Sequence, residues 1–212
     1  MAEIEWLGHA CFKITDREGI CIVTDPFSQK DVGYRTPEVE ADIALVSHDH
    51  FDHNKVKVLK GKPSVIKGEG KKKAKNIEFK GIETFHDDSK GRMRGKNTVF
   101  VFEVDGVRFC HLGDLGHILD ENQIRDIGEV DVLFIPVGGT FTINAREADK
   151  VIEQLTPKII VPMHYKTEVV TLPIEPLNKF LENKTEVERT KKLIVERETL
   201  PEVPKIVVLE YE

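Results

Sequence analysis

Three of the eight histidines of this chain fall within six residues, in the segment HDHFDH at residues 48–53. An apolar run at residues 42–47 comes directly before it, so we expect the segment to form the loop at the C-terminal end of a strand. In an extended loop, residues at i and i+2 point the same way, so His48 and His50 can bind one cation together. Asp52 and His53 follow and can bind a second cation.

Imidazole and carboxylate ligands without a thiolate suit zinc, with manganese and iron as alternatives. This ligand set favours a catalytic site over a closed, cysteine-rich structural site. The three cysteines lie in apolar, strand-like segments, where we expect free thiols in the core: Cys11, Cys21 and Cys110. The alternative is a surface loop that binds metal only adventitiously.

The pattern HxHxDH after a strand resembles the motif of the metallo-β-lactamase superfamily. In that superfamily, three further ligands follow in order: a histidine at a strand end, an aspartate in a Gly-Asp turn and a late histidine. The resemblance places these ligands at His86, Asp114 and His164, and it spans residues 4 to 165.

Five shorter strings narrow the resemblance: LGHA at 7–10, RGKNT at 94–98, GDLGH at 113–117, PVGG at 136–139 and PMHY at 162–165. They are similar to an uncharacterised bacterial and archaeal group of metal-dependent hydrolases related to L-ascorbate-6-phosphate lactonase. The resemblance implies an α+β fold, an αββα sandwich in which two mixed β-sheets pack face to face with helices outside. We expect one such domain over residues 1–212.

The resemblance also implies a binuclear site. The first metal ion would be bound by His48, His50 and His86, and the second by Asp52, His53 and His164, with Asp114 bridging them. Two divalent ions, about 3.5–4 Å apart in such sites, lower the pKa of a shared water and make a bridging hydroxide available. This hydroxide would attack an ester, lactone or phosphoester bond. Asp52 is the predicted catalytic residue, which would orient the attacking water and move its proton.

Two more histidines compete with His86 as a ligand, because His111 and His117 lie three residues before and after Asp114. We favour His86, since the third histidine of the superfamily lies at a strand end well before the Gly-Asp turn. For His111 we expect a hydrogen-bonded place in the core.

Two residues near the N-terminus are expected to support the site. His9 lies in a turn between two strands, and it either lines the pocket or orients a ligand from outside. Asp25 ends a strand, and we expect it to brace the histidine loop instead of touching substrate.

The segment at residues 88–96 is polar, contains glycines and follows His86, so we expect a mobile loop at the rim of the site. Arg92 or Arg94 could bind a phosphate or carboxylate of the substrate in a bidentate manner. The alternative is that both are merely solvent-exposed. A second rim is predicted at residues 138–140, where backbone N–H groups could meet an anion.

The apolar pattern predicts the elements that position these residues. Strands are expected at residues 2–7, 10–15, 20–24, 42–47, 97–104, 107–112, 131–136, 158–162, 192–197 and 205–211. Helices are expected at residues 120–127, 144–155 and 175–181. Strands thus come first and then alternate with helices, which favours packed sheets with helices outside.

A chain of 212 residues with 40% apolar residues can bury one core. With a net charge of −6, the chain does not have the overall positive charge typical of a nucleic-acid binder. The dense basic run at residues 71–75 is interpreted as solvated surface between turns. No leader or membrane-spanning run is recognisable, so we expect a cytoplasmic protein without membrane contact. We expect a small-molecule substrate, which would be anionic if an arginine binds it. The sequence allows either a monomer or a homo-oligomer.

Three competing functions fit less well. Diiron redox members of the superfamily resemble a pattern with Glu in place of the second histidine and carry a flavin domain, whereas this chain has His50. Nuclease and phosphodiesterase branches that act on nucleic acid add a large domain, for which the chain has no room. A degenerate, purely metal-binding module would lack ligands, and none of the seven positions is substituted.

Overall fold

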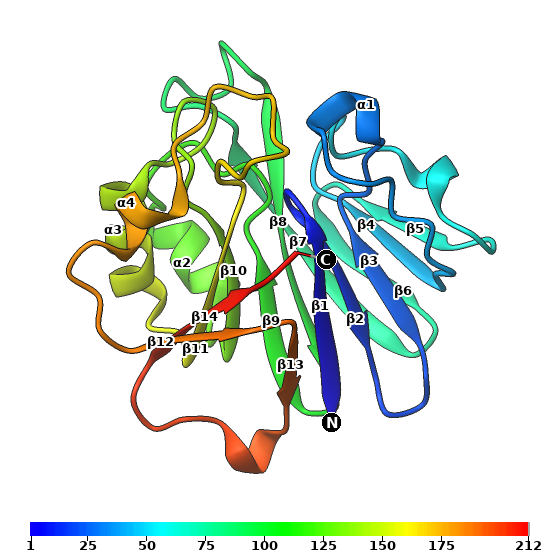
Figure 1. Ribbon diagram of the computed structural model, residues 1–212. Helices are drawn as coiled ribbons and strands as arrows, with labels where there is room; N and C mark the ends of the chain where they lie inside the picture. Colours follow the sequence, from blue (N-terminus) through cyan, green and yellow to red (C-terminus); the bar gives the residue numbers. More distant parts are fainter. Residues whose placement is uncertain (212) are drawn as a thin grey trace.

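A computed structural model describes residues 1–211, and it has two mixed β-sheets that pack face to face (Figure 1). The six-stranded sheet has the order β13 (Lys192–Val195), β1 (Ala2–Gly8), β2 (Cys11–Thr15), β3 (Cys21–Thr24), β4 (Ile43–Val46) and β5 (Ser64–Lys67). The eight-stranded sheet has the order β12 (Val187–Thr190), β14 (Lys205–Leu209), β11 (Ile159–Met163), β10 (Val132–Pro136), β9 (Val107–His111), β8 (Lys96–Val104), β7 (Ile77–Phe85) and β6 (Gly70–Ala74).

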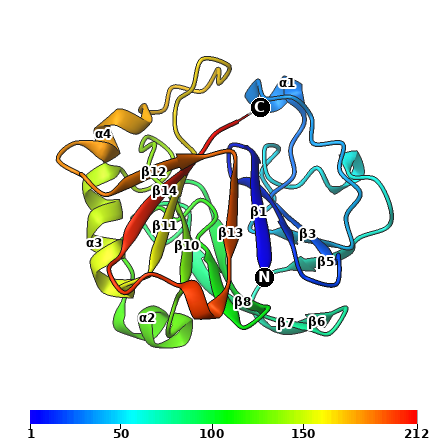
Figure 2. The same ribbon diagram turned by 60° about the horizontal axis from the view of Figure 1, so that its bottom comes forward.

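The helices are few and short. They are α1 (Gln29–Val32), α2 (Glu121–Ile127), α3 (Ala145–Leu155) and α4 (Leu177–Leu181), with 3₁₀ turns at Val56–Val58 and Arg197–Thr199. Figures 1 and 2 show α2, α3 and α4 outside the eight-stranded sheet, while α1 lies beside the six-stranded one. The predicted fold class, two mixed sheets with helices outside, is confirmed. None of the helices among the described residues has the length and apolar character needed to cross a membrane.

Local sequence signals account for several boundaries. Asp105 and Gly106, between β8 and β9, have φ values of 51° and 77°, as a tight hairpin turn requires. Asn144 accepts hydrogen bonds from the first turn of α3, and Glu147 bonds back to the N–H of Asn144. The register of β10 and β11 is parallel, so their C-terminal ends meet at one edge of the sheet.

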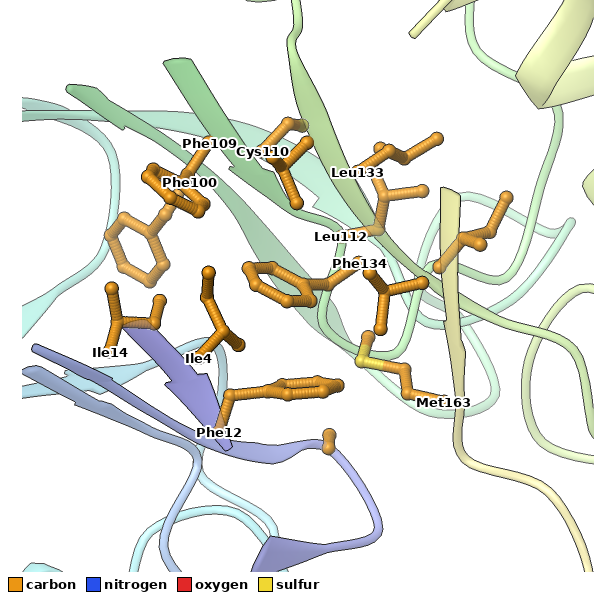
Figure 3. Close-up of a cluster of buried hydrophobic side chains, with 14 of the residues drawn as sticks. Ile4, Phe12, Ile14, Phe100, Phe109, Cys110, Leu112, Leu133, Phe134 and Met163 are labelled. Atoms are coloured by element: carbon orange, nitrogen blue, oxygen red, sulfur yellow. The ribbon is translucent and has the colours of Figure 1, made fainter. Parts of the chain in front are cut away.

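The core lies between the sheets (Figure 3). Ile4, Phe12 and Ile14 of the six-stranded sheet face the aromatic rings of Phe109 and Phe134 from the eight-stranded sheet. The rings of Phe12 and Phe134 pack with their centroids 4.3 Å apart, which joins the layers directly. All three cysteines are buried free thiols, as predicted.

The apolar pattern did not predict four strands, β5, β6, β7 and β12, although the resemblance implied a strand that ends at His86. The lysine run that we placed between turns belongs to β6, at the edge of the eight-stranded sheet. Three consecutive lysines show no apolar alternation, but charged side chains are common on an edge strand because they discourage pairing with another chain. That part of the interpretation was wrong, although Lys71, Lys72 and Lys73 are largely solvated.

Candidate metal centre

Four loops converge at the same edge of the sandwich, the upper one in Figure 1. They follow β4, β7, β9 and β11, so strands of both sheets contribute to one place. The loops bring together all seven residues that the sequence predicts as metal ligands: His48, His50, Asp52, His53, His86, Asp114 and His164.

Asp114 lies at the middle of this cluster. Its Oδ2 atom is 3.1 Å from Nε2 of His86, 3.2 Å from Nε2 of His53, 3.3 Å from Nε2 of His164 and 3.9 Å from Nε2 of His48. One carboxylate oxygen therefore faces imidazoles from three other loops, which is the place that a bridging ligand would occupy.

The cluster contains three overlapping groups of atoms close enough to share an ion. In the first group, His48, His50 and His86 offer ligand atoms within 4.8 Å of one another. In the second group, Asp52, His53 and His164 do the same, and His9 joins them. A third group, formed by His48, His53 and Asp114, links the first two. The first two groups contain the residues predicted for the two ions, whereas His9 was not expected among possible ligands.

The residues present fit a metal ion. Nε2 of His48, Nε2 of His53, Nδ1 of His164 and Oδ1 of Asp114 are buried without a hydrogen-bond partner. An unsatisfied buried polar atom costs about 1–3 kcal/mol, so a fold does not gather four of them without a partner to bind. Imidazole nitrogens and carboxylate oxygens are the donors that zinc, manganese and iron accept.

Oxygen atoms outside the cluster orient three of its histidines. The Ser47 hydroxyl donates to Asp25 at 2.8 Å, which leaves its oxygen to accept from Nδ1 of His48 at 2.9 Å. Nδ1 of His86 lies 2.9 Å from the carbonyl oxygen of Phe141. Nδ1 of His53 lies 3.2 Å from Oδ2 of Asp25, which makes an electrostatic contact without the geometry of a hydrogen bond. A proton held at each Nδ1 leaves the Nε2 lone pair facing the cluster, as a metal ligand needs.

Asp25 is the main support of the histidine loop. Its side chain is fully buried and accepts hydrogen bonds from the backbone N–H and hydroxyl of Ser47, and from Nε2 of His111 at 2.8 Å. The structure places it as the sequence predicts, behind the histidines and away from the cavity. His111 is a hydrogen-bonded core residue, also as expected, and it belongs to none of the groups that could hold an ion.

His117 does not reach the cluster either. Its Nε2 accepts the backbone N–H of Phe85 at 3.1 Å, and its Nδ1 lies 2.8 Å from the carbonyl of Ile118. It fixes the end of β7, directly before His86. Of the three histidines that competed for this ligand position, only His86 among the described residues lies beside Asp114.

His9 contacts the second group from behind. It is fully buried, and its Nε2 lies at hydrogen-bond distance, 3.2 Å, from Oδ2 of Asp52. Its carbonyl oxygen accepts from the indole of Trp6 at 3.0 Å and from the backbone N–H of His164 at 3.2 Å. Of the two roles predicted for His9, orienting a ligand fits this position, whereas direct contact with substrate does not.

Burial and neighbouring charges set the protonation of the site. Burial lowers the pKa of His9 to about 4 and that of His48 to about 3, so both are neutral near pH 7. Burial alone would raise the pKa of Asp52 and Asp114, but their histidine neighbours hold both values below the usual range. Against the effect of burial, Asp114 in turn raises the pKa of His53 and His86, so without a metal ion protons on these imidazoles balance the carboxylates, and a bound cation would take their place.

A cavity of about 260 Å³ opens above the cluster. Asp52, His86, Asp114 and His164 line it together with Arg94 and three apolar side chains, Phe51, Phe141 and Leu172. Arg94 thus lies at the cavity, as the sequence allowed, whereas Arg92 is exposed and does not line it.

The loop between His86 and Arg94 is less free than the sequence predicts. The carboxylate of Asp87 accepts backbone N–H groups of Ser89, Gly91, Met93 and Arg94 at 2.7–3.0 Å. The loop does line the rim, but these four bonds fix its backbone. Our expectation of a mobile loop took its glycines as the signal and overlooked the aspartate at its start.

The predicted anion site at residues 138–140 has one of its N–H groups already engaged. The N–H of Gly139 donates to the carbonyl of Ile143, so it is not free to meet an anion. At Gly138, an added Cβ would lie 2.1 Å from the carbonyl oxygen of His164. A glycine is therefore needed here because the backbone packs closely against the residue that follows β11.

Sequence reasoning missed Asp87 and the apolar wall residues Phe51, Phe141 and Leu172. Phe51 carried a usable signal, because it is an aromatic residue inside the histidine motif and is 53% exposed. Phe141 and Leu172 lie in the loops after β10 and β11, far from the histidine motif in sequence.

Comparisons with known proteins agree with this geometry. Residues 3–164 match the family model described as the beta-lactamase superfamily domain. A UPF0173 metal-dependent hydrolase from Pyrococcus furiosus is 31% identical over 195 residues, covering 79% of this chain and 86% of the relative. Another from Thermococcus onnurineus is 29% identical over 215 residues, covering 88% and 95% of the two chains.

Among solved structures, a candidate zinc-dependent hydrolase of the metallo-β-lactamase superfamily from Thermotoga maritima is 41% identical. The match covers 100% of both chains with a TM-score of 0.84. A metallo-hydrolase from Ignicoccus hospitalis shares the fold at 20% identity, with a TM-score of 0.64 over 85% of this chain and 89% of that one.

Proposed function

Because the chain belongs to the metallo-β-lactamase superfamily and to its UPF0173 metal-dependent hydrolase family, we propose that it hydrolyses an ester, lactone or phosphoester bond of a small molecule. The observation that carries the proposal is the position of Asp114 between two groups of imidazoles under an open cavity. A structural metal site would be closed by its ligands, whereas this one borders a space for substrate.

We propose two divalent ions in the centre. His48, His50 and His86 would hold one and Asp52, His53 and His164 the other, with Asp114 between them. When bound, such ions supply hydroxide near neutral pH and polarise the oxygen of the bond to be cleaved. Zinc is our first choice, in keeping with the description of the Thermotoga maritima relative, and manganese and iron are the alternatives.

Asp52 is the proposed catalytic residue. It is ionised, it lines the cavity, and Oδ2 of its carboxylate is paired with Nε2 of His9. Fixed in this way, the carboxylate can orient the attacking water and take its proton, then deliver the proton to the leaving group. His9 would keep it in place without touching substrate.

The proposal is tested by metal analysis of the purified protein and by activity screens after loading with zinc or manganese. The screen should contain carboxylic esters, thioesters, phosphodiesters and lactones. Phosphorylated lactones are included because the predicted relation to L-ascorbate-6-phosphate lactonase remains a proposal. We expect about two metal ions per chain and hydrolysis in at least one class.

A matched pair of variants controls the experiment. Asp114→Asn should lose both bound metal and activity, whereas Asp49→Asn should keep both, because Asp49 lies in the same loop but faces Lys67 at the surface. Fewer than one metal ion per chain, with no activity in any class, would contradict the proposal.

A further inference from the structure

The cavity above the metal centre combines one cationic side chain with an apolar wall. Its floor is formed by the buried residues of the cluster, and its wall by Phe51, Phe141 and Leu172. Among the described residues that line it, Arg94 is the only one with a positive charge that does not titrate near neutral pH. The volume of about 260 Å³ lies just below the range of about 300–1,000 Å³ of drug-sized ligand pockets, so the cavity suits a compact group.

Arg94 is held in place from two sides. Its guanidinium group donates to the carbonyl oxygen of Thr140 at 3.1 Å, and it lies over the ring of Phe141, 5.5 Å from the centroid. Its backbone N–H donates to Asp87, the residue that follows His86. The arginine is therefore fixed relative to the cluster instead of swinging in solvent.

The fixed guanidinium still has donors to offer. An arginine side chain carries five N–H donors in a planar fork, and the bond to Thr140 uses one of them. A carboxylate or phosphate accepts two parallel N–H bonds from such a fork. Arg94 also lines a second groove of about 470 Å³ beside His48 and His50, so it borders both spaces.

We propose that Arg94 is the specificity-determining residue of this site, and that the substrate carries a compact apolar body with one anionic group at the end remote from the metal centre. The inference rests on the proposed function, since it takes the cluster as the place where the scissile bond lies. The apolar body would contact Phe51, Phe141 and Leu172, and the anionic group would pair with Arg94.

A purely structural role for Arg94 gives different expectations. In that case the guanidinium would only join the loop of residues 88–95 to the loop of residues 139–141. Its replacement would then weaken the binding of neutral and anionic ligands equally. If Arg94 binds an anion, its replacement should remove the preference for anionic over neutral ligands.

The test uses two metal-directed ligands of matched length and measures binding by calorimetry to the metal-loaded protein. Glutaric monohydroxamate and pentanohydroxamate both bind metal through the hydroxamate, but only the first has a carboxylate at its far end. Suberic monohydroxamate and octanohydroxamate form a longer pair that covers a larger separation between metal and arginine. Since the hydroxamate contribution cancels within a pair, the ratio of the two dissociation constants reports the distal group.

We expect the wild type to prefer the anionic member of one pair by about 10- to 100-fold, the worth of a hydrogen bond to a charged group. Arg94→Met should abolish this preference, so that the two members of a pair bind the variant equally, and Arg94→Lys should restore part of it. Arg92→Met is the matched control, because Arg92 lies in the same loop but outside the cavity, and it should keep the full preference.

The possible results of this binding experiment separate the role of Arg94 from the presence of the metal centre. Equal binding of neutral and anionic members to the wild type in both pairs, or a preference that survives Arg94→Met, would overturn the inference while leaving the proposed function intact. Failure of all four hydroxamates to bind would contradict the metal centre itself, and with it both proposals.

Discussion

Replacing Asp25 by Asn should weaken the fold and the metal centre together. Asp25 is fully buried and accepts two hydrogen bonds from Ser47 and one from His111. An asparagine of the same shape turns an NH₂ group toward at least one of these donors and removes the negative charge beside His53, whose Nδ1 is 3.2 Å away.

The magnitude follows from these contacts. Hydrogen bonds to a charged partner contribute about 1.5–3 kcal/mol each, and breaking a buried charge pair costs about 3–5 kcal/mol. These terms are not additive, and losing the buried charge offsets part of them, so we expect the free energy of unfolding to fall by about 3 kcal/mol. Because Asp25 supports His48 through Ser47 and faces His53 directly, metal affinity should fall about 10- to 100-fold.

The assay is urea denaturation of the metal-free protein, combined with metal competition against a chromophoric chelator. Asp49→Asn is the control, since Asp49 has the same chemistry in the same loop but a 66% exposed side chain paired with Lys67. An exposed pair contributes about 1 kcal/mol at most. Equal stability of the two variants, together with unchanged metal affinity in Asp25→Asn, would refute the bracing role.

Five further substitutions test the site. Asp52→Asn should lower kcat at least about 100-fold while the circular dichroism spectrum stays unchanged, and near-full activity with bound metal would rule out its catalytic role. His9→Phe removes the donor to Asp52 but fills the space, so metal competition should show about tenfold weaker binding at the second group. His86→Ala should release one metal ion per chain in elemental analysis, whereas His117→Ala should keep both. In Gly116→Ala the new Cβ would lie 2.3 Å from the carbonyl carbon of His86. We therefore expect the free energy of unfolding to fall by about 1–3 kcal/mol. Thermal unfolding with and without a chelator should also show that metal no longer stabilises the variant.

The parts of the fold that the sequence predicts are those with a strong local pattern. The buried parallel strands β10 and β11 are uninterrupted apolar runs, and α3 begins with a capping box. The edge strand β6 shows neither feature, because its place depends on pairing with β7 and not on burial of its own side chains. β7 itself alternates buried and exposed residues along much of its length, which is the periodic pattern of a half-buried strand.

The same distinction holds for the site. The positions of the ligands could be predicted because a six-residue motif and three strand-end positions are visible in the chain. The supports of the cavity could not, because they join distant segments. Arg94 meets the carbonyl of Thr140, 46 residues later, and His86 meets that of Phe141, 55 residues later. Contacts to backbone carbonyls leave no trace in residue type, so no motif marks them.

The residues that orient the ligands from outside the cluster differ between histidines, and one of them serves both groups. His86 is oriented by a backbone carbonyl, so no side-chain substitution at Phe141 can remove that acceptor. His48, in the first group, and His53, in the second, both depend on Asp25, one through Ser47 and the other directly. A single carboxylate outside the cluster therefore couples the two halves of the centre. Loss of that carboxylate should weaken binding of both ions, whereas loss of any one histidine should weaken mainly its own.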